Sequence, residues 1–115
     1  MENYKEKRPW GEFENLLDTS LCKVKQITIK VGQSPSYQYH FKRREIWTII
    51  KGKGELKLND ILMPVETGQT LHIEKEEKHQ IRNTGAEDLI FIEIQLGEYF
   101  GEDDIVRLED NYGRV

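Results

Sequence analysis

Short runs of alternating apolar and polar residues recur along the chain, and most of them end at Gly, Pro, Asn or Asp. A period of two residues is typical of β-strands that bury one face, because successive side chains point to opposite sides. No run shows a convincing helical spacing. Short strands with turn residues about every eight to twelve positions predict an all-β sandwich or barrel.

The pattern predicts strands over residues 10–16, 23–31, 37–41, 45–50, 55–58, 61–63, 68–73 and 89–96. The pair Asn59–Asp60 is typical of a two-residue hairpin loop. Residues 1–9 are polar and are expected to be frayed, and the acidic tail after Gly101 is expected to hold one turn or to be irregular. Trp10 and Phe13 are expected to anchor the core.

The strand predicted at residues 89–96 has one polar and one apolar face. Glu93 lies on the face that also carries Phe91 and Gln95, and three isoleucines lie on the opposite face. Either face of a barrel strand can be the inner one. Glu93 is therefore a base or a supporting residue inside the barrel if the polar face points inward, and a surface residue if the isoleucines do.

Four side chains form a set that is typical of a metal site. Gln38 and His40 lie two residues apart on a predicted strand, so they point to the same side. Glu45 begins the apolar run IWTII, and His79 follows the charged loop at residues 74–78. Two imidazoles and a carboxylate bind metals, and a neutral amide can add a weak fourth ligand. We therefore predict a metal site of Gln38, His40, Glu45 and His79.

The ligand types leave the identity of the metal open. Two histidines, one glutamate and one glutamine suit zinc, and they also suit iron, manganese, cobalt or nickel. The third histidine of the chain, His72, lies between Leu71 and Ile73. We expect His72 to be structural or solvated rather than a ligand.

The candidate ligands fit two known motifs. Gly32, Gln38, His40, Glu45 and Gly52 match the first cupin motif, G-x5-H-x-H-x4-E-x6-G, with Gln38 in the first His position. Gly68, His79 and Asn83 match the second motif, in which Glu74 and Glu76 replace the usual Pro and Gly. The segments RPWGEFENL, QYHFKRREIW and IEIQLGEYFGEDDIVRLEDNYGR resemble the type II mannose-6-phosphate isomerase domain, in the same order, over about residues 8–114.

This resemblance implies a fold and an activity. It implies that residues 1–115 form a single cupin domain, a double-stranded β-helix or jelly-roll barrel, and it favours zinc as the metal. That domain usually forms the C-terminal part of bifunctional phosphomannose isomerase and mannose-1-phosphate guanylyltransferase enzymes. The implied reaction interconverts mannose 6-phosphate and fructose 6-phosphate. The nucleotidyltransferase half is missing, so no guanylyltransferase activity is expected.

Such a reaction needs a base and a cation besides the metal. A base takes the proton from C2 of the sugar, and Glu93 is the candidate if it faces inward. Arg43 occupies the arginine of the family's QxHxxRxExW run, which implies that it binds phosphate or stabilises the charge of an enediolate. Without that motif, residues 42–44 would be interpreted as a solvated basic turn. Lys78 and Arg82 are weaker phosphate candidates.

Two other functions stay open at this point. The same barrel with its metal can bind a sugar phosphate without turnover, or it can be another cupin metalloenzyme such as an iron-dependent dioxygenase. The chain also departs from the family at several positions. Phe41, Lys42 and Ile46 stand where family members often carry histidines, and Gln80 stands where an arginine often follows the second-motif histidine.

Composition and charge argue against nucleic-acid binding, membrane insertion and secretion. The net charge of −4 gives no general affinity for nucleic acid or for acidic membranes. No apolar run reaches the roughly 18 residues of a membrane span, and the polar start is no secretory signal. The single cysteine, Cys22, cannot form an internal disulfide, which fits a reducing cytoplasm. We expect a cytoplasmic protein that binds a small sugar phosphate and, from the resemblance, forms a homodimer.

Overall fold

The computed structural model describes residues 3–113, and within that range it contains strands and no helix. The strands are β1 (Lys5–Arg8), β2 (Gly11–Asp18), β3 (Lys23–Ile29), β4 (Tyr37–Tyr39), β5 (Arg43–Lys51), β6 (Lys53–Leu58), β7 (Ile61–Glu66), β8 (Thr70–Ile73), β9 (His79–Asn83), β10 (Leu89–Gly97) and β11 (Val106–Glu109). They form a six-stranded sheet in the order β1-β2-β3-β10-β5-β8 and a five-stranded sheet in the order β11-β4-β9-β6-β7. Both sheets are antiparallel, which confirms the all-β prediction.

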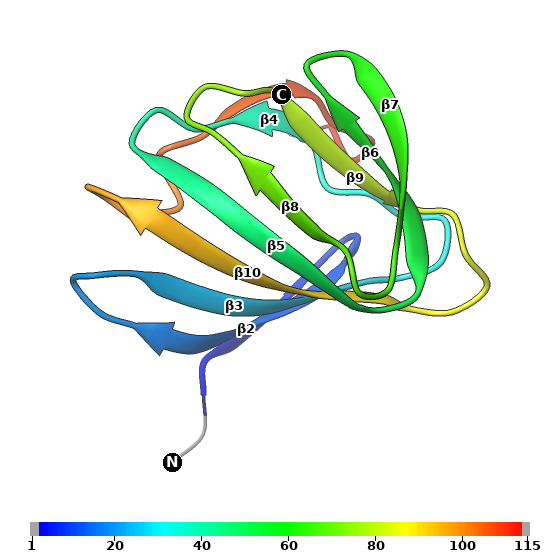
Figure 1. Cartoon of the computed structure of the whole chain (residues 1–115), viewed down its shortest axis with the longest axis horizontal. Coiled ribbons are helices and arrows are strands. Elements are labelled where there is room, and N and C mark those ends of the chain that lie inside the picture. The colour runs from blue at the N-terminus through cyan, green and yellow to red at the C-terminus, as the bar shows by residue number, and fades with distance from the viewer. Residues whose placement is uncertain (1–2, 114–115) are drawn as a thin grey trace.

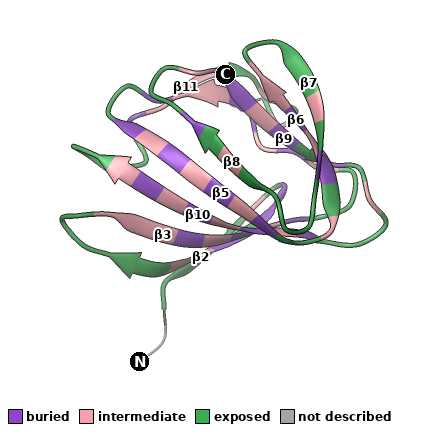
Figure 2. Ribbon diagram, viewed as in Figure 1, coloured by how far each residue is buried: buried purple, intermediate pink, exposed green. Residues whose placement is uncertain are grey.

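The two sheets enclose a common interior (Figure 1). β5 and β10 are the longest strands, at nine residues each, and they pair in the middle of the larger sheet. Along both strands buried residues alternate with half-buried ones, as the banding in Figure 2 shows. One face of each strand therefore lines the interior and the other faces outward.

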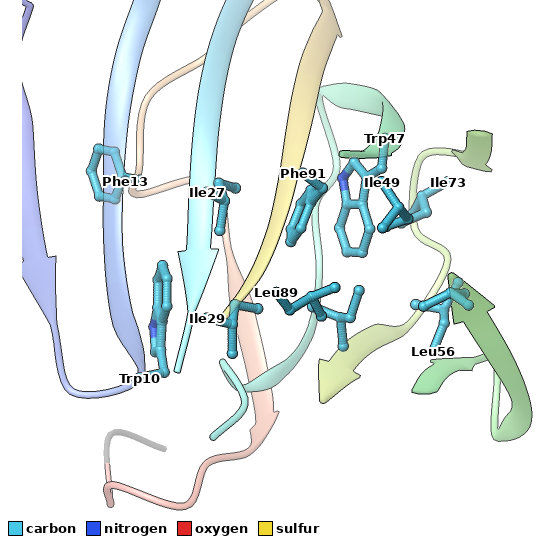
Figure 3. Packing of buried hydrophobic residues seen from close by; sticks show 12 residues of the cluster. Trp10, Phe13, Ile27, Ile29, Trp47, Ile49, Leu56, Ile73, Leu89 and Phe91 are labelled. Carbon is cyan, nitrogen blue, oxygen red and sulfur yellow. The ribbon is translucent and has the colours of Figure 1, made fainter. Parts of the chain in front are cut away.

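The apolar core fills one part of this interior. Its members are Trp10, Phe13, Ile27, Ile29, Trp47, Ile49, Leu56, Val65, Ile73, Ile81, Leu89 and Phe91. They come from both sheets, and the ring of Phe91 lies against that of Trp47 with centroids 4.6 Å apart (Figure 3). Trp10 and Phe13 are both buried, as predicted.

The inner face of β10 is its partly polar one. Phe91, Glu93 and Gln95 are all buried, whereas the three isoleucines between and before them are half-buried on the outer face. This settles which of the two faces points inward. The predicted homodimer stays a prediction.

Two expectations for the ends of the chain were wrong. Residues 5–8 form β1, which pairs with β2, and the acidic tail contributes β11, which pairs with β4. Both segments are held by backbone hydrogen bonds to a neighbouring strand, which a polar sequence can make as well as an apolar one. The expectation for residues 1–2 lies outside the described residues.

Local backbone geometry explains one hairpin turn and one close approach between two strands of the barrel. Asn59 and Asp60 have φ angles of 48° and 71°, which a tight hairpin of the predicted type requires. Gly97 pairs with Arg43 across β10 and β5, and a Cβ atom there would lie 2.2 Å from the carbonyl oxygen of Lys42. Only glycine allows this close approach, which sets the start of β5. Within residues 3–113 no helix has the length and apolarity of a membrane span.

Candidate metal centre

Three of the predicted ligands meet inside the barrel. His40 follows β4, Glu45 lies on β5 and His79 begins β9, so both sheets contribute. One potential ligand atom from each of the three lies within 4.8 Å of the other two, and all three side chains are buried. The two imidazole rings are 5.2 Å apart between centroids. Folding therefore brings together residues that are far apart in the sequence.

Both imidazoles are oriented as metal ligands. Nδ1 of His40 lies 2.7 Å from the carbonyl oxygen of Asp104, and Nδ1 of His79 lies 2.9 Å from that of Glu77. A carbonyl oxygen only accepts, so each Nδ1 carries the proton and each Nε2 of the neutral ring presents a lone pair. The Nε2 atom of His79 is buried without a hydrogen-bond partner. Such fixed tautomers are typical of metal-binding histidines.

Burial keeps both rings neutral. It lowers the pKa of His40 to about 4, against the opposing effect of the Glu45 carboxylate. Burial also lowers the pKa of His79, again against Glu45. A neutral imidazole is the form that binds a metal, so the ligands need no deprotonation near neutral pH.

Glu45 is ionised because of its neighbours. Burial alone would raise the pKa of this carboxyl, but the charge of Arg43 opposes burial and, with the hydrogen bond from Trp47, lowers the pKa. Its Oε1 accepts a hydrogen bond of 2.9 Å from the indole of Trp47, and its Oε2 accepts one of 2.8 Å from Nε of Arg43. The carboxylate is thus held in one orientation.

Arg43 would compete with the candidate metal for lone pairs of Glu45 and His40. Its Nη2 lies 3.3 Å from Nε2 of His40, and its Nε donates to Glu45. A guanidinium and a metal ion both need electron pairs of these two ligands, so metal binding requires Arg43 to give up part of this contact. Its Nη1 is buried without a hydrogen-bond partner and Arg43 lines the interior cavity, which gives the side chain an alternative position.

Gln38 lies beside this cluster. It pairs across the sheet with His79 and lines the same cavity. Its Oε1 accepts a hydrogen bond of 2.7 Å from the hydroxyl of Ser36. The role of Gln38 as a fourth ligand stays a prediction.

Glu93 lines the same cavity as His40, Arg43 and His79. Burial, assisted by the negative charge of Glu45, raises the pKa of Glu93 to about 7. The amide of Gln95 donates a hydrogen bond to its Oε1. A buried carboxyl that titrates near neutral pH can both accept and donate a proton under ordinary conditions.

The weaker phosphate candidates lie elsewhere. Lys78 donates a hydrogen bond of 3.0 Å to Asp60, and Arg82 is exposed on β9; neither lines the cavity. His72 is exposed on β8, in agreement with a solvated histidine.

Sequence reasoning missed the residues that support His40. The carbonyl of Asp104 accepts from its ring, and the Asp104 carboxylate accepts from the backbone N–H groups of Phe41 and Lys42 at 3.0 and 2.9 Å. The N–H of Glu76 donates to the His40 carbonyl at 2.8 Å. Glu76 has a φ of 65°, which explains why the motif has glycine at this position. The closing motif, EDDIVR, was the signal for Asp104.

The residues present fit a divalent metal. Two neutral imidazoles and one ionised carboxylate whose ligand atoms lie within 4.8 Å of one another, with one unpartnered Nε2 atom among them, are what such an ion needs. Two antiparallel sheets that enclose these residues define the class of protein: a cupin with a candidate metal centre.

Comparison with known proteins narrows the class. The family model described as "Mannose-6-phosphate isomerase C-terminal" matches residues 2–110, and the chain belongs to this family. The xanthan biosynthesis protein XanB of Xanthomonas campestris is 39% identical over 108 residues, which cover 94% of this chain and 23% of that protein. The mannose-1-phosphate guanylyltransferase of Klebsiella pneumoniae is 38% identical over 107 residues, covering 93% and 23%. The chain therefore spans less than a quarter of the length of these curated relatives.

A solved structure supports the fold. An uncharacterised conserved protein with a double-stranded β-helix domain from Klebsiella pneumoniae superposes with a TM-score of 0.74 at 23% identity, over 84% of this chain and 77% of that chain. The predicted cupin fold is thus confirmed. The names of the two relatives and of the family support a sugar-related cupin.

Proposed function

We propose that this chain is a metal-dependent aldose–ketose isomerase that interconverts mannose 6-phosphate and fructose 6-phosphate. The observation that carries the proposal is the presence of Glu93 in the same cavity as the candidate ligands Gln38, His40 and His79, with a pKa raised to about 7. An isomerase needs a group that removes a proton from one carbon and returns it to the next. The family match supports the choice of substrate.

The candidate ligands have one role in this proposal. His40, Glu45 and His79, with Gln38 as a fourth ligand, hold the ion, and zinc is the metal that the family favours over iron, manganese, cobalt and nickel. A divalent ion at this site would polarise the sugar carbonyl as a Lewis acid. Glu45 would bind the metal and already accepts hydrogen bonds from Arg43 and Trp47, so it would not be available as the base.

Glu93 and Arg43 carry the proton and the charge. Ionised Glu93 takes the proton from C2 of open-chain mannose 6-phosphate, and its protonated form returns a proton to C1. The hydroxyl proton on O2 moves to O1 in the same conversion, so fructose 6-phosphate forms with no net gain or loss of protons. Negative charge develops on the sugar oxygens between these two transfers. Arg43, which is buried and lines the cavity, is the cation that would stabilise that charge through its N–H groups.

A direct assay tests the proposal. Metal-depleted protein is loaded in turn with zinc, manganese, cobalt, nickel and iron, and formation of fructose 6-phosphate from mannose 6-phosphate is followed. We expect turnover with at least one metal and none after chelation. Tight binding of mannose 6-phosphate without turnover under every metal would instead favour a sugar-phosphate-binding cupin. Oxygen consumption with bound iron would favour a dioxygenase.

A further inference from the structure

One ion pair at the cavity plays no part in the proposed proton transfer. Lys25 on β3 is 4% exposed, and its Nζ is hydrogen-bonded to Oε1 of Glu102. Nζ of Lys23 lies 3.8 Å from the same oxygen. The Glu102 side chain is 47% exposed, so the cation is buried and fixed while its anion is accessible to solvent.

Lys25 lies on the strand next to the one that carries the candidate base, Glu93. Lys25 pairs directly with Glu93 on β10, and Glu93 pairs with Trp47 on β5, the strand that carries Glu45. Adjacent strands lie about 4.8 Å apart. Lys25 on β3 is therefore one strand away from Glu93 on β10 and two strands away from β5, which carries Glu45. In a hexose 6-phosphate the phosphate lies at the opposite end of the chain from C1 and C2. Lys25 is on the side of Glu93 that faces away from β5, which is one direction in which the phosphate of a sugar bound at the ligands can extend.

The cavity as it stands is small for such a substrate. Its volume is about 90 Å³, and sites for small molecules usually have at least roughly 300 Å³. Glu102 and Arg8 both line it, and Arg8 lies over the ring of Phe13, whose centroid is also 4.1 Å from Nζ of Lys25. Movement of the exposed Glu102 side chain would enlarge the cavity beside these two cations.

We propose that Lys25, with Lys23 and Arg8, forms the phosphate subsite of the substrate, and that Glu102 occupies it as an internal anion until phosphate displaces it. This rests on the proposed function, which it extends to the recognition of the phosphorylated end. A phosphate offers more acceptor oxygens and more negative charge than a carboxylate, so it is the stronger partner for these cations. Asp104, two residues further on, accepts hydrogen bonds from the backbone N–H groups of Phe41 and Lys42, which anchors the segment that follows Glu102.

Binding of inorganic phosphate to the metal-depleted protein tests the proposal, because without the metal ion phosphate can bind only to the protein's own cations. Calorimetry is used for the wild type, Glu102→Gln and Lys25→Met. We expect Glu102→Gln to bind phosphate about tenfold more tightly, since the competing anion is lost, and Lys25→Met to bind it at least about tenfold more weakly. Glu98→Gln, an exposed carboxylate of the same loop, and Lys30→Met, an exposed lysine, are the controls and should match the wild type.

A purely structural ion pair gives the opposite result for one variant. Glu102→Gln would then melt at a lower temperature and bind phosphate no more tightly than the wild type, which would overturn the proposal. If Lys25→Met does not fold, Glu102→Gln still decides. Phosphate binding that follows the expected order in a protein without isomerase activity would reject the proposed function and keep the subsite; isomerase activity with unchanged phosphate affinities would do the reverse.

Discussion

The two ends of the cavity each hold an ion pair with a buried cation, but the two pairs differ in how far the anion is exposed to solvent. At the metal end, Arg43 neutralises Glu45, and both side chains are at most 5% exposed. At the Lys25 end, which the charge of Arg43 also reaches, Glu102 neutralises Lys25, but the Glu102 side chain is 47% exposed. A buried pair is costly to separate, whereas a pair with one solvated partner exchanges that partner easily. The comparison indicates a rigid end for chemistry and an adaptable end for recognition.

Removal of a ligand should have the largest effect on the rigid end. His79→Ala, or equally His40→Ala, is expected to weaken metal binding by more than about 100-fold, because loss of an outer partner alone usually costs up to that amount. The barrel should stay folded, since neither histidine is a member of the apolar core cluster, although the ring of His79 lies against Trp47 of that cluster. Metal content after dialysis measures the effect, and His72→Ala on exposed His72 is the matched control. Full metal occupancy in either variant would remove that residue from the site.

Loss of the base should abolish turnover and leave both ends intact. Glu93→Gln is expected to lower kcat by about 10² to 10⁴, the usual contribution of a general base, with unchanged metal and phosphate affinities. Glu87→Gln, at an exposed carboxylate before β10, serves as the control. An active Glu93→Gln enzyme would transfer the role of base to another group.

The pH dependence gives a second test of Glu93. Only the ionised carboxyl takes a proton, so kcat/KM for mannose 6-phosphate should rise as the pH increases through about 7. Because the folded-state pKa lies above the ordinary 4.5, the fold favours the protonated form. Its stabilising contribution is complete below pH 4.5 and is lost as the pH rises through 7, on the order of 3 kcal/mol. Denaturation of the wild type and of Glu93→Gln at several pH values isolates this difference, and parallel curves would contradict it.

Arg43 distinguishes catalysis from metal binding at the same end. Arg43→Ala is expected to lower turnover by about 10²-fold, as removal of one charge-stabilising donor does. Metal should be retained with a dissociation constant no higher than that of the wild type, because the guanidinium shares lone pairs of Glu45 and His40. Arg44→Ala, at the next residue on the outer face, is the control. Normal kinetics would exclude Arg43 from the reaction, and weaker metal binding would show that it positions Glu45 instead.

The smallest effect on metal affinity is expected from a change to Asp104, whose carbonyl accepts a hydrogen bond from the ring of His40. Asp104→Asn weakens the two hydrogen bonds to the N–H groups of Phe41 and Lys42, and metal affinity should fall by about tenfold. Adjacent Asp103, whose carboxylate accepts a hydrogen bond from exposed Tyr99, provides the control variant Asp103→Asn. Equal metal affinities in the two variants would mean that the carbonyl of Asp104 alone positions the ring.

Much of the fold was predictable because the apolar pattern reports burial. The alternation of Ile27 and Ile29 gave β3, and the ligand spacing with the motif matches brought His40, Glu45 and His79 together before any coordinates. β1 and β11 escaped prediction because polar strands are specified by their backbone partners rather than by their own side chains. The inner face of β10 could not be chosen, since a period of two residues is the same for both faces.

The site was less predictable than the fold because its contacts join distant segments. The hydrogen bond between His40 and Asp104 spans 64 residues, and the pair of Lys25 and Glu102 spans 77. Lys25 did leave a signal, because it shares a strand face with Ile27 and Ile29 and therefore points into the core. A lysine at a core-facing position needs an anionic partner, but the sequence does not identify that partner.

Isomerisation in deuterated water tests the central claim most directly. If Glu93 moves a solvent-exchangeable proton between C2 and C1 next to a bound metal, fructose 6-phosphate formed from mannose 6-phosphate will carry deuterium at C1. Neither Glu93→Gln nor His79→Ala should form it. A product without deuterium, or the same labelled product from either variant at the wild-type rate, would contradict this account.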